Sequence, residues 1–184
     1  VDSHDNPPIE DYDLTLLPAT DTFNADIIAR KVSSTEAILV CSSEYARRRG
    51  VPSTPEELPL HDILRLRTAG SLQRVWRLFN SERQDEVLDV VVEPGVWINH
   101  TETLVRAVLG GAGITSMAID LAAPYLTRGE LVRVLRPWIS GRLSLYAALP
   151  SRKFMPERTR IFLEFLIDRM RNQRANAAHA CENC

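Results

Sequence analysis

The 184-residue sequence contains only three cysteines, and no apolar run in it is long enough to cross a membrane. Cys41, Cys181 and Cys184 cannot form the disulfide framework that stabilises small secreted domains, so we expect a reducing compartment, the cytoplasm, and no membrane partner. The first residues do not resemble a signal peptide. Because the chain also lacks a starting Met, we expect it to be a fragment of a longer protein.

An excess of positive charge is also missing. The chain has 22 Lys and Arg residues against 24 Asp and Glu residues, which gives a formal net charge of -2. Domains that bind nucleic acid are usually basic, so this balance argues against direct DNA or RNA binding by these residues. It leaves open an attached nucleic-acid-binding domain.

The sequence has no recognisable catalytic or cofactor motif. It lacks a Ser-His-Asp set with a nucleophile elbow, and the glycines at 110–113 follow their helix, on the wrong side for a dinucleotide fingerprint. His179, Cys181 and Cys184 offer three metal ligands, whereas structural zinc sites normally have four. They also lie in residues 172–184, which we expect to form a flexible tail. We therefore expect no enzyme, no metal and no cofactor.

Apolar residues make up 45% of the chain, which is enough for a packed core. The central stretch predicts a strand that ends at Ile98, a helix, a glycine turn over 110–113, and a further strand from Ile114. Asn99 is a suitable N-cap, and Glu102, three residues later, completes a capping-box pattern. Apolar residues then recur at helical spacing as far as residue 112.

A polar residue at such a strand-to-helix corner lies beside free backbone N–H groups and the positive end of the helix, which suits an anion. Two interpretations of Asn99 stand side by side: it caps its helix and does nothing else, or it also contacts an anionic ligand. His100 has the same two interpretations, a plain surface residue or a partner for an anion. His61 and Cys41 are expected to be structural.

The remaining elements alternate between strands and helices, which predicts an α/β fold with largely parallel pairing. We expect strands at 13–17 (ended by Pro18), 37–41, 63–66, 75–79 paired with 87–92, 131–135 (ended by Pro137) and 143–149. Helices are expected at 43–49, from Thr54, in a short turn opened by Pro124, and from Pro156 to about residue 171. The expected buried side of the last helix comprises Ile161, Phe162, Phe165, Leu166 and Met170.

Taken together, several segments resemble the effector-binding domain of LysR-type transcriptional regulators. The matching segments are 13–16, 38–45 with 50–52, 54–58 with His61, 99–114, 129–135 with Trp138, and 145–151 with 162–166. None is specific alone, but their order and spacing hold from Asp13 to about Met170.

The resemblance implies a fold of two Rossmann-like subdomains like the periplasmic binding proteins (type 2), with a cleft between them. Residues 1–41 and 145–171 would form an incomplete first subdomain and residues 42–144 the second. A small-molecule effector, which we expect to be anionic, would bind in the cleft. The effector-binding residues so implied are Pro18, Thr20, Thr68, Ser71, Asn99, His100, Thr101 and Met117.

This sequence departs from the family at three places. Its first strand and first helix are absent, Leu17 stands where many members have Arg, and Met117 with Ala118 replaces an end of the strand that often contains Pro. The identity of the effector therefore does not follow from the resemblance. The family's N-terminal winged helix-turn-helix is also absent from this sequence.

Three functional hypotheses follow. The first is the ligand-sensing domain of a bacterial LysR-type regulator, which controls DNA binding and transcription through a homodimer or homotetramer and contacts DNA only through the missing winged helix-turn-helix. The alternative is a stand-alone periplasmic-type solute-binding protein of the same fold, with a secretion signal upstream. The third is an enzyme on the same scaffold, for which the sequence offers no convergent catalytic set.

Overall fold

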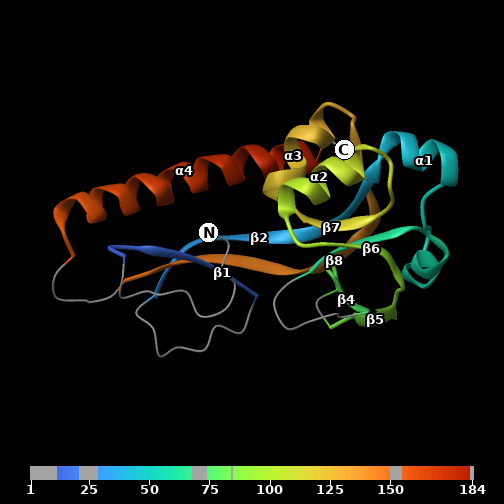
Figure 1. Cartoon of the computed structure of the whole chain (residues 1–184), viewed down its shortest axis with the longest axis horizontal. Helices are drawn as coiled ribbons and strands as arrows, with labels where there is room; N and C mark the ends of the chain where they lie inside the picture. Colours follow the sequence, from blue (N-terminus) through green and yellow to red (C-terminus); the bar gives the residue numbers. More distant parts are fainter. Residues whose placement is uncertain (1–11, 21–28, 68–73, 84, 150–154, 183–184) are drawn as a thin grey trace. The chain divides into compact units, whose positions relative to one another are not determined.

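The computed structural model describes residues 12–20, 29–67, 74–83, 85–149 and 155–182 (Figure 1). The chain divides into two compact units, residues 1–35 with 142–176, and residues 36–141 with 177–184. Two long strands, β2 (Ala29–Ser42) and β8 (Leu131–Ala148), contribute residues to both units. The subdomain boundaries expected from the sequence, after residues 41 and 144, stay a prediction.

In the first unit, β1 (Thr15–Thr20) pairs antiparallel with the second half of β8. Pro18 was expected to end this strand, and that expectation is wrong, because Pro18 lies inside β1 opposite Leu145. Within the described residues β1 pairs only with β8, so it is an edge strand. An edge strand tolerates proline because every second N–H points away from the sheet.

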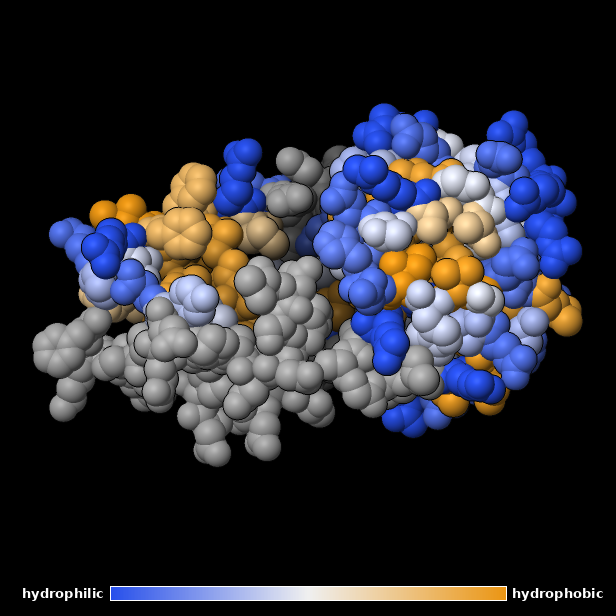
Figure 2. Space-filling model, in the orientation of Figure 1, coloured by the Kyte–Doolittle hydropathy of each residue, from blue (hydrophilic) through white to orange (hydrophobic). Residues whose placement is uncertain are grey.

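The long helix α4 (Glu157–Glu182) packs on the first unit through Leu163, which is 1% exposed and clusters with Val32 and Ala147. The buried side expected for α4 is correct for two of its five residues. Leu166 and Met170 pack against this cluster, but Ile161, Phe162 and Phe165 are exposed, in the part of the helix where Figure 2 shows apolar side chains at the surface. The backbone of α4 also continues as helix beyond residue 171, where we expected the tail to begin.

The second unit contains a main sheet with the strand order β5–β4–β8–β2–β7, together with a small sheet of β3 and β6. The strands are β3 (Ile63–Leu66), β4 (Val75–Asn80), β5 (Val87–Val91), β6 (Pro94–Ile98) and β7 (Thr115–Ala118). The predicted pairing of residues 75–79 with 87–92 is confirmed, because β4 and β5 are antiparallel neighbours. Elsewhere largely parallel pairing was expected, yet β4 with β8 and β2 with β7 are antiparallel, whereas β3 with β6 is parallel. The short turn after Asn80 joins β4 to β5, and such a turn allows only antiparallel neighbours.

Residues 37–41 of the central strand β2 are buried on both faces, as their continuous apolar run predicted. Ile38 and Val40 belong to one core cluster, and Leu39 and Cys41 belong to another. The first cluster also contains apolar residues of α2 (Thr101–Leu109) and α3 (Ile119–Thr127), which lie together in Figure 1. The helix α2 therefore packs its buried side on this core cluster.

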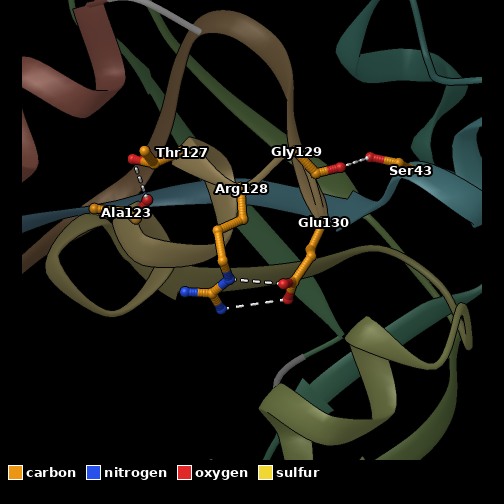
Figure 3. Close-up of polar contacts among 6 residues, drawn as sticks. All are labelled: Ser43, Ala123, Thr127, Arg128, Gly129 and Glu130. Carbon is orange, nitrogen blue, oxygen red and sulfur yellow. Dashed lines mark hydrogen bonds and ion pairs between the residues drawn. The ribbon is translucent and has the colours of Figure 1, made fainter.

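The helix α1 (Ser43–Arg49) has the bounds that the sequence predicts, with Ser42 capping the N–H of Tyr45 and Gly50 at its end. Its first residue is tied to the turn between α3 and β8, because the Ser43 hydroxyl donates to the Gly129 carbonyl (Figure 3). In the same turn Arg128 donates two hydrogen bonds to the Glu130 carboxylate, at 2.6 and 3.3 Å. The hydrogen bonds from Arg128 lower the pKa of Glu130.

Thr54 precedes a 3-10 helix, η1 (Pro55–Leu60), where a helix was expected. After η1, the Nδ1 atom of His61 shares a hydrogen bond with the Tyr45 hydroxyl at 3.2 Å, and the same hydroxyl accepts the N–H of Asp62 at 3.0 Å. The structural role expected for His61 is thereby confirmed. This network fastens α1 to the start of β3.

Two other prolines lie inside elements that they were expected to limit. Pro124 lies within α3 rather than at its start, and Pro137 lies within β8, which joins the two strands expected at 131–135 and 143–149. The Pro137 carbonyl still accepts the N–H and the hydroxyl of Ser81, so only the N–H of the proline is missing from the strand. The strand is nevertheless irregular here, because Leu135, two residues before the proline, has a φ of 55°.

Candidate functional site

The candidate site is the N-terminal end of α2, where β6 ends beside β3. Because these two strands are parallel, their carboxyl ends lie together, with Leu66 opposite Ile98. The Arg67 N–H donates to the Ile98 carbonyl at 2.6 Å, which holds the residue after β3 against the end of β6. The chain then turns through Asn99 and His100 into α2. In α/β folds, ligands bind at such carboxyl ends of strands.

The cap of α2 differs from the expectation. His100, not Asn99, is the N-cap residue, and no side-chain hydrogen bond caps the helix. Glu102 was expected to close a capping box, but its carboxylate accepts the Arg106 guanidinium at 2.7 Å instead. An i,i+4 partner on the same helix outcompetes the cap, because Arg106 brings a full charge to Glu102.

The first turn of α2 consequently presents its backbone N–H groups without a side-chain cap from the described residues. Leu104 is the first residue whose N–H bonds back into the helix, to the His100 carbonyl at 3.1 Å. The amides that precede it carry the partial positive charge of the helix end. Asn99, His100 and Thr101 surround them and are all exposed. This arrangement can accept a carboxylate or another small anion.

Two arginines that no sequence motif marked, Arg65 and Arg67, lie at this end of β3. Arg67 is exposed and follows the strand directly. Arg65 precedes Leu66 in β3 and lies opposite Trp97 of β6. Its guanidinium stacks on Trp76, 5.1 Å from the centre of the ring. Burial lowers the pKa of Arg65, although an arginine stays charged at neutral pH. Their position beside the end of β6 follows from the parallel pairing of β3 with β6, which the sequence does not reveal.

The other expected effector contacts are distributed as follows. Pro18 is exposed and Thr20 ends β1, both in the first unit, while Thr68 and Ser71 lie outside the described residues. Met117 is 4% exposed and packs in the core cluster beneath α2. The structure thus brings Asn99, His100 and Thr101 together at one helix end. The roles of all these residues as effector contacts stay predictions.

Other chemistry that the sequence raised gains no structural support. Cys41 is fully buried, and burial raises the pKa of its thiol to about 11, so it is an unreactive core residue. Within the described residues no group of three His, Cys, Asp or Glu side chains could hold a metal. His179 and Cys181 lie in α4 where side chains are not described, and Cys184 lies outside the described residues. No helix of the described part is long and apolar enough to span a membrane.

Comparison with protein families places residues 10–171 under the LysR substrate binding domain. Among curated relatives, the HTH-type transcriptional regulator PtxR of Pseudomonas aeruginosa is 32% identical over 140 residues, which is 75% of this chain and 43% of PtxR. The probable HTH-type transcriptional regulator SinR of Salmonella typhimurium is 31% identical over 151 residues, 80% of this chain and 47% of SinR. The chain spans about half the length of the curated relatives it matches.

Solved structures show the same likeness. The full-length virulence activator AphB of Vibrio cholerae, a member of the LTTR family, matches with a TM-score of 0.74 and 26% identity, covering 90% of this chain and 55% of AphB. The regulatory domain of CrgA, a LysR-type transcriptional regulator of Neisseria meningitidis, matches with a TM-score of 0.72 and 25% identity, covering 88% of this chain and 76% of that domain.

Proposed function

This chain belongs to the LysR-type transcriptional regulators as their substrate-binding domain, and we propose that it binds a small anionic effector at the N-terminal end of α2 and thereby controls transcription. The fold expected from the sequence, of the periplasmic-binding-protein type, is that of LysR regulatory domains. The stand-alone solute-binding protein is not favoured, because the relatives are HTH-type regulators.

The observation that supports an anionic effector is the first turn of α2, which no side chain of the described residues caps. Helix ends usually receive a side-chain oxygen from the preceding residues, whereas here His100 provides no such bond and Glu102 is held by Arg106. No side-chain oxygen of the described residues caps these amides, and we assign them to an external acceptor. The backbone of Arg67 is hydrogen-bonded to Ile98 at the end of β6, and we assign its exposed guanidinium as a second partner of the anion. A ligand carboxylate satisfies both features.

We assign each residue at this helix end a specific part. The N–H groups of the first turn bind the anionic group, and the Thr101 hydroxyl and the Asn99 amide hydrogen-bond the atoms beside it. His100 contributes its imidazole, a donor to an anion. The remaining proposed contacts, which determine what lies beyond the anionic group, are Pro18, Thr20, Thr68, Ser71 and Met117.

Effector binding can change DNA binding through thermodynamic linkage. An effector that binds one arrangement of the regulatory domain more tightly than another shifts the population toward the first. In the whole protein, a homodimer or homotetramer would transmit this shift to N-terminal winged helix-turn-helix domains, which contact DNA in the cytoplasm. No step in this scheme needs catalysis, and the relatives are regulators rather than enzymes.

A thermal-shift screen tests this function. The domain is screened against small carboxylates, aromatic acids, amino acids and neutral analogues, with the wild type beside Asn99→Ala and Thr101→Ala. We expect acids to raise Tm saturably in the wild type, since a ligand that binds only the folded state stabilises it, and the two variants to lose most of the increase.

Thr103→Ala is the matched control, because Thr103 is an exposed threonine on the same helix about 200° around its axis from Thr101. It should keep the increase. A Tm increase that survives Asn99→Ala and Thr101→Ala would move the site elsewhere, and an increase with neutral analogues alone would contradict the anionic class.

A further inference from the structure

Arg65 carries a charge for which the described residues provide no partner. Its side chain is half-buried, and its guanidinium stacks on Trp76 at 5.1 Å from the centre of the ring. Within the described residues this guanidinium makes neither a hydrogen bond nor an ion pair. Burying a charged group costs free energy unless hydrogen-bond acceptors or an opposite charge offset the loss of water. The position of this arginine therefore requires an explanation.

Arg128 shows what a satisfied arginine of the same kind looks like. Its guanidinium also stacks on an aromatic ring, 4.8 Å from the centre of Tyr125. In addition, it donates two hydrogen bonds to the Glu130 carboxylate, at 2.6 and 3.3 Å. The ring covers the guanidinium from one side while the carboxylate accepts its N–H groups. Arg65 has the ring without the carboxylate.

The side chain of Arg65 points away from α2 and from the effector site proposed there. Side chains alternate between the two faces of a strand. Leu64 belongs to the core cluster that contains residues of α2, whereas Ile63 belongs to the cluster that contains Trp76. Arg65 therefore extends from the face of β3 that carries Ile63. An effector at the first turn of α2 lies on the other side of this strand and leaves the charge of Arg65 unmatched.

Trp97 adds an aromatic surface beside this charge. It is the residue of β6 opposite Arg65, and its side chain is half-buried. Its neighbour Ile98 packs in the core cluster of α2, so the alternation places Trp97 on the same face of the small sheet as Arg65. Trp76 lies against this face from β4. One guanidinium and two indole rings are thus gathered on the side of the small sheet that faces away from α2.

We propose that Arg65, Trp76 and Trp97 form a second binding site, which accepts an aromatic carboxylate. The planar guanidinium donates two parallel hydrogen bonds to the carboxylate, and Trp76 holds the guanidinium plane. The ring of the ligand stacks on the half-exposed indole of Trp97. A carboxylate on an aromatic ring satisfies both the arginine and the indole, whereas inorganic phosphate satisfies only the arginine. The site shares no residue with the effector site at α2, so it gives the domain a second input.

Indole N–H signals in ¹⁵N spectra of the 184-residue chain test this site. The chain has three tryptophans, and Trp97→Phe and Trp138→Phe assign their signals. Titration with benzoate should move the signals of Trp76 and Trp97 saturably. Benzamide, which has the same ring without the charge, should leave both in place. Because one arginine and two rings offer few contacts, we expect weak binding, which these signals detect at concentrations that raise Tm little.

Arg65→Met removes the charge and keeps a long side chain over Trp76. It should weaken benzoate binding about tenfold or more, because charged hydrogen bonds are lost. Arg65→Lys keeps the charge without the planar fork and should bind with intermediate affinity. Arg128→Gln is the matched control, since Arg128 also stacks on a ring but is already paired with Glu130. It should bind benzoate like the wild type.

Stability distinguishes a binding arginine from a structural one. Because the charge of Arg65 has no partner in the described residues, ligand-free Arg65→Met should have a Tm no lower than that of the wild type. A lower Tm would show that Arg65 is structural and would count against the site. If Arg65→Met does not fold, Arg65→Lys decides, since wild-type affinity for benzoate in that variant would overturn the bidentate contact.

Thr101→Ala separates this site from the effector site. It should keep the benzoate-induced changes at Trp97 and lose the acid-induced changes at the first turn of α2, and Arg65→Met should do the reverse. Loss of both in Thr101→Ala would show a single site and overturn the second one. Benzoate that leaves Trp76 and Trp97 unmoved in the wild type, or that moves them equally in Arg65→Met, would also overturn it. Inorganic phosphate that moves both signals where benzoate does not would contradict the aromatic class.

Discussion

Replacing Gly113 with alanine should strongly destabilise the second unit. Gly113 has a φ of +153°, which L residues rarely adopt, and a Cβ atom placed on it would lie 2.2 Å from the Asp62 carbonyl oxygen. The neighbouring Ile114 N–H donates to that same carbonyl at 2.8 Å. The close approach thus belongs to the contact between the start of β3 and the start of β7, which follows the C-terminal end of α2.

The magnitude follows from two costs. A non-glycine residue in such a conformation costs about 1–3 kcal/mol. Separating the two backbones to admit the methyl group costs about a further 1–3 kcal/mol. We expect Gly113→Ala to lower the free energy of unfolding by about 2–6 kcal/mol, a large fraction of the stability of a typical domain.

Urea unfolding followed by tryptophan fluorescence measures this loss in the relevant unit. Trp76, Trp97 and Trp138 are the three tryptophans of the chain, and all lie in the second unit. Gly95→Ala is the control, because no atom lies within 4 Å of a Cβ at Gly95 and its φ is not positive. It should stay within about 1 kcal/mol of the wild type. A Gly113→Ala protein as stable as Gly95→Ala would refute the steric argument.

Two further predictions concern buried titratable groups. Burial, followed by the positive charge of Arg49, holds the pKa of His61 below its ordinary value, so the unfolded chain binds the extra proton more readily than the folded chain. Stability should therefore be complete above about pH 6.5 and fall as the pH drops below that value; His61→Gln should flatten this dependence in urea titrations at pH 7.5 and 5.5. Because burial raises the pKa of Cys41 to about 11, a Cys181→Ser/Cys184→Ser protein should react with a thiol reagent at pH 8 only after unfolding. Rapid labelling of the folded protein would show that Cys41 is accessible.

Local sequence signals predicted the elements whose causes are local. The bounds of α1 follow from Ser42 at its start and Gly50 at its end, and the burial of β2 follows from one unbroken apolar run. The segments that resemble the LysR family identified the family correctly, because they recur in a fixed order over most of the chain.

Features that depend on partners distant in sequence escaped prediction. Pro18 continues β1 because nothing within the described residues pairs with the other edge of that strand. Phe162 and Phe165 have the helical spacing of a buried face, but Leu163 and its neighbours occupy the side of α4 that meets the first unit. A helix with two apolar faces does not reveal from its own sequence which one is covered.

The same reasoning applies to the candidate site. Asn99 and Glu102 have the right spacing for a capping box, yet Glu102 binds Arg106 and the helix begins one residue later. The sequence placed the start of the helix within one residue of its position in the structure, with the wrong cap, and anion binding there stays a prediction. Arg67 was missed because its proximity follows from the pairing of β3 with β6, which no local pattern reveals.

Amide chemical shifts of the first turn of α2 test the central claim most directly. A ¹⁵N-labelled domain is titrated with the acid that raises Tm most in the screen, with its neutral amide analogue as control. We expect the N–H signals of Thr101, Glu102 and Thr103 to move downfield and to saturate together with the Tm increase, and the amide analogue to leave them in place. Binding of the acid that leaves these three signals unmoved while others shift would contradict the account.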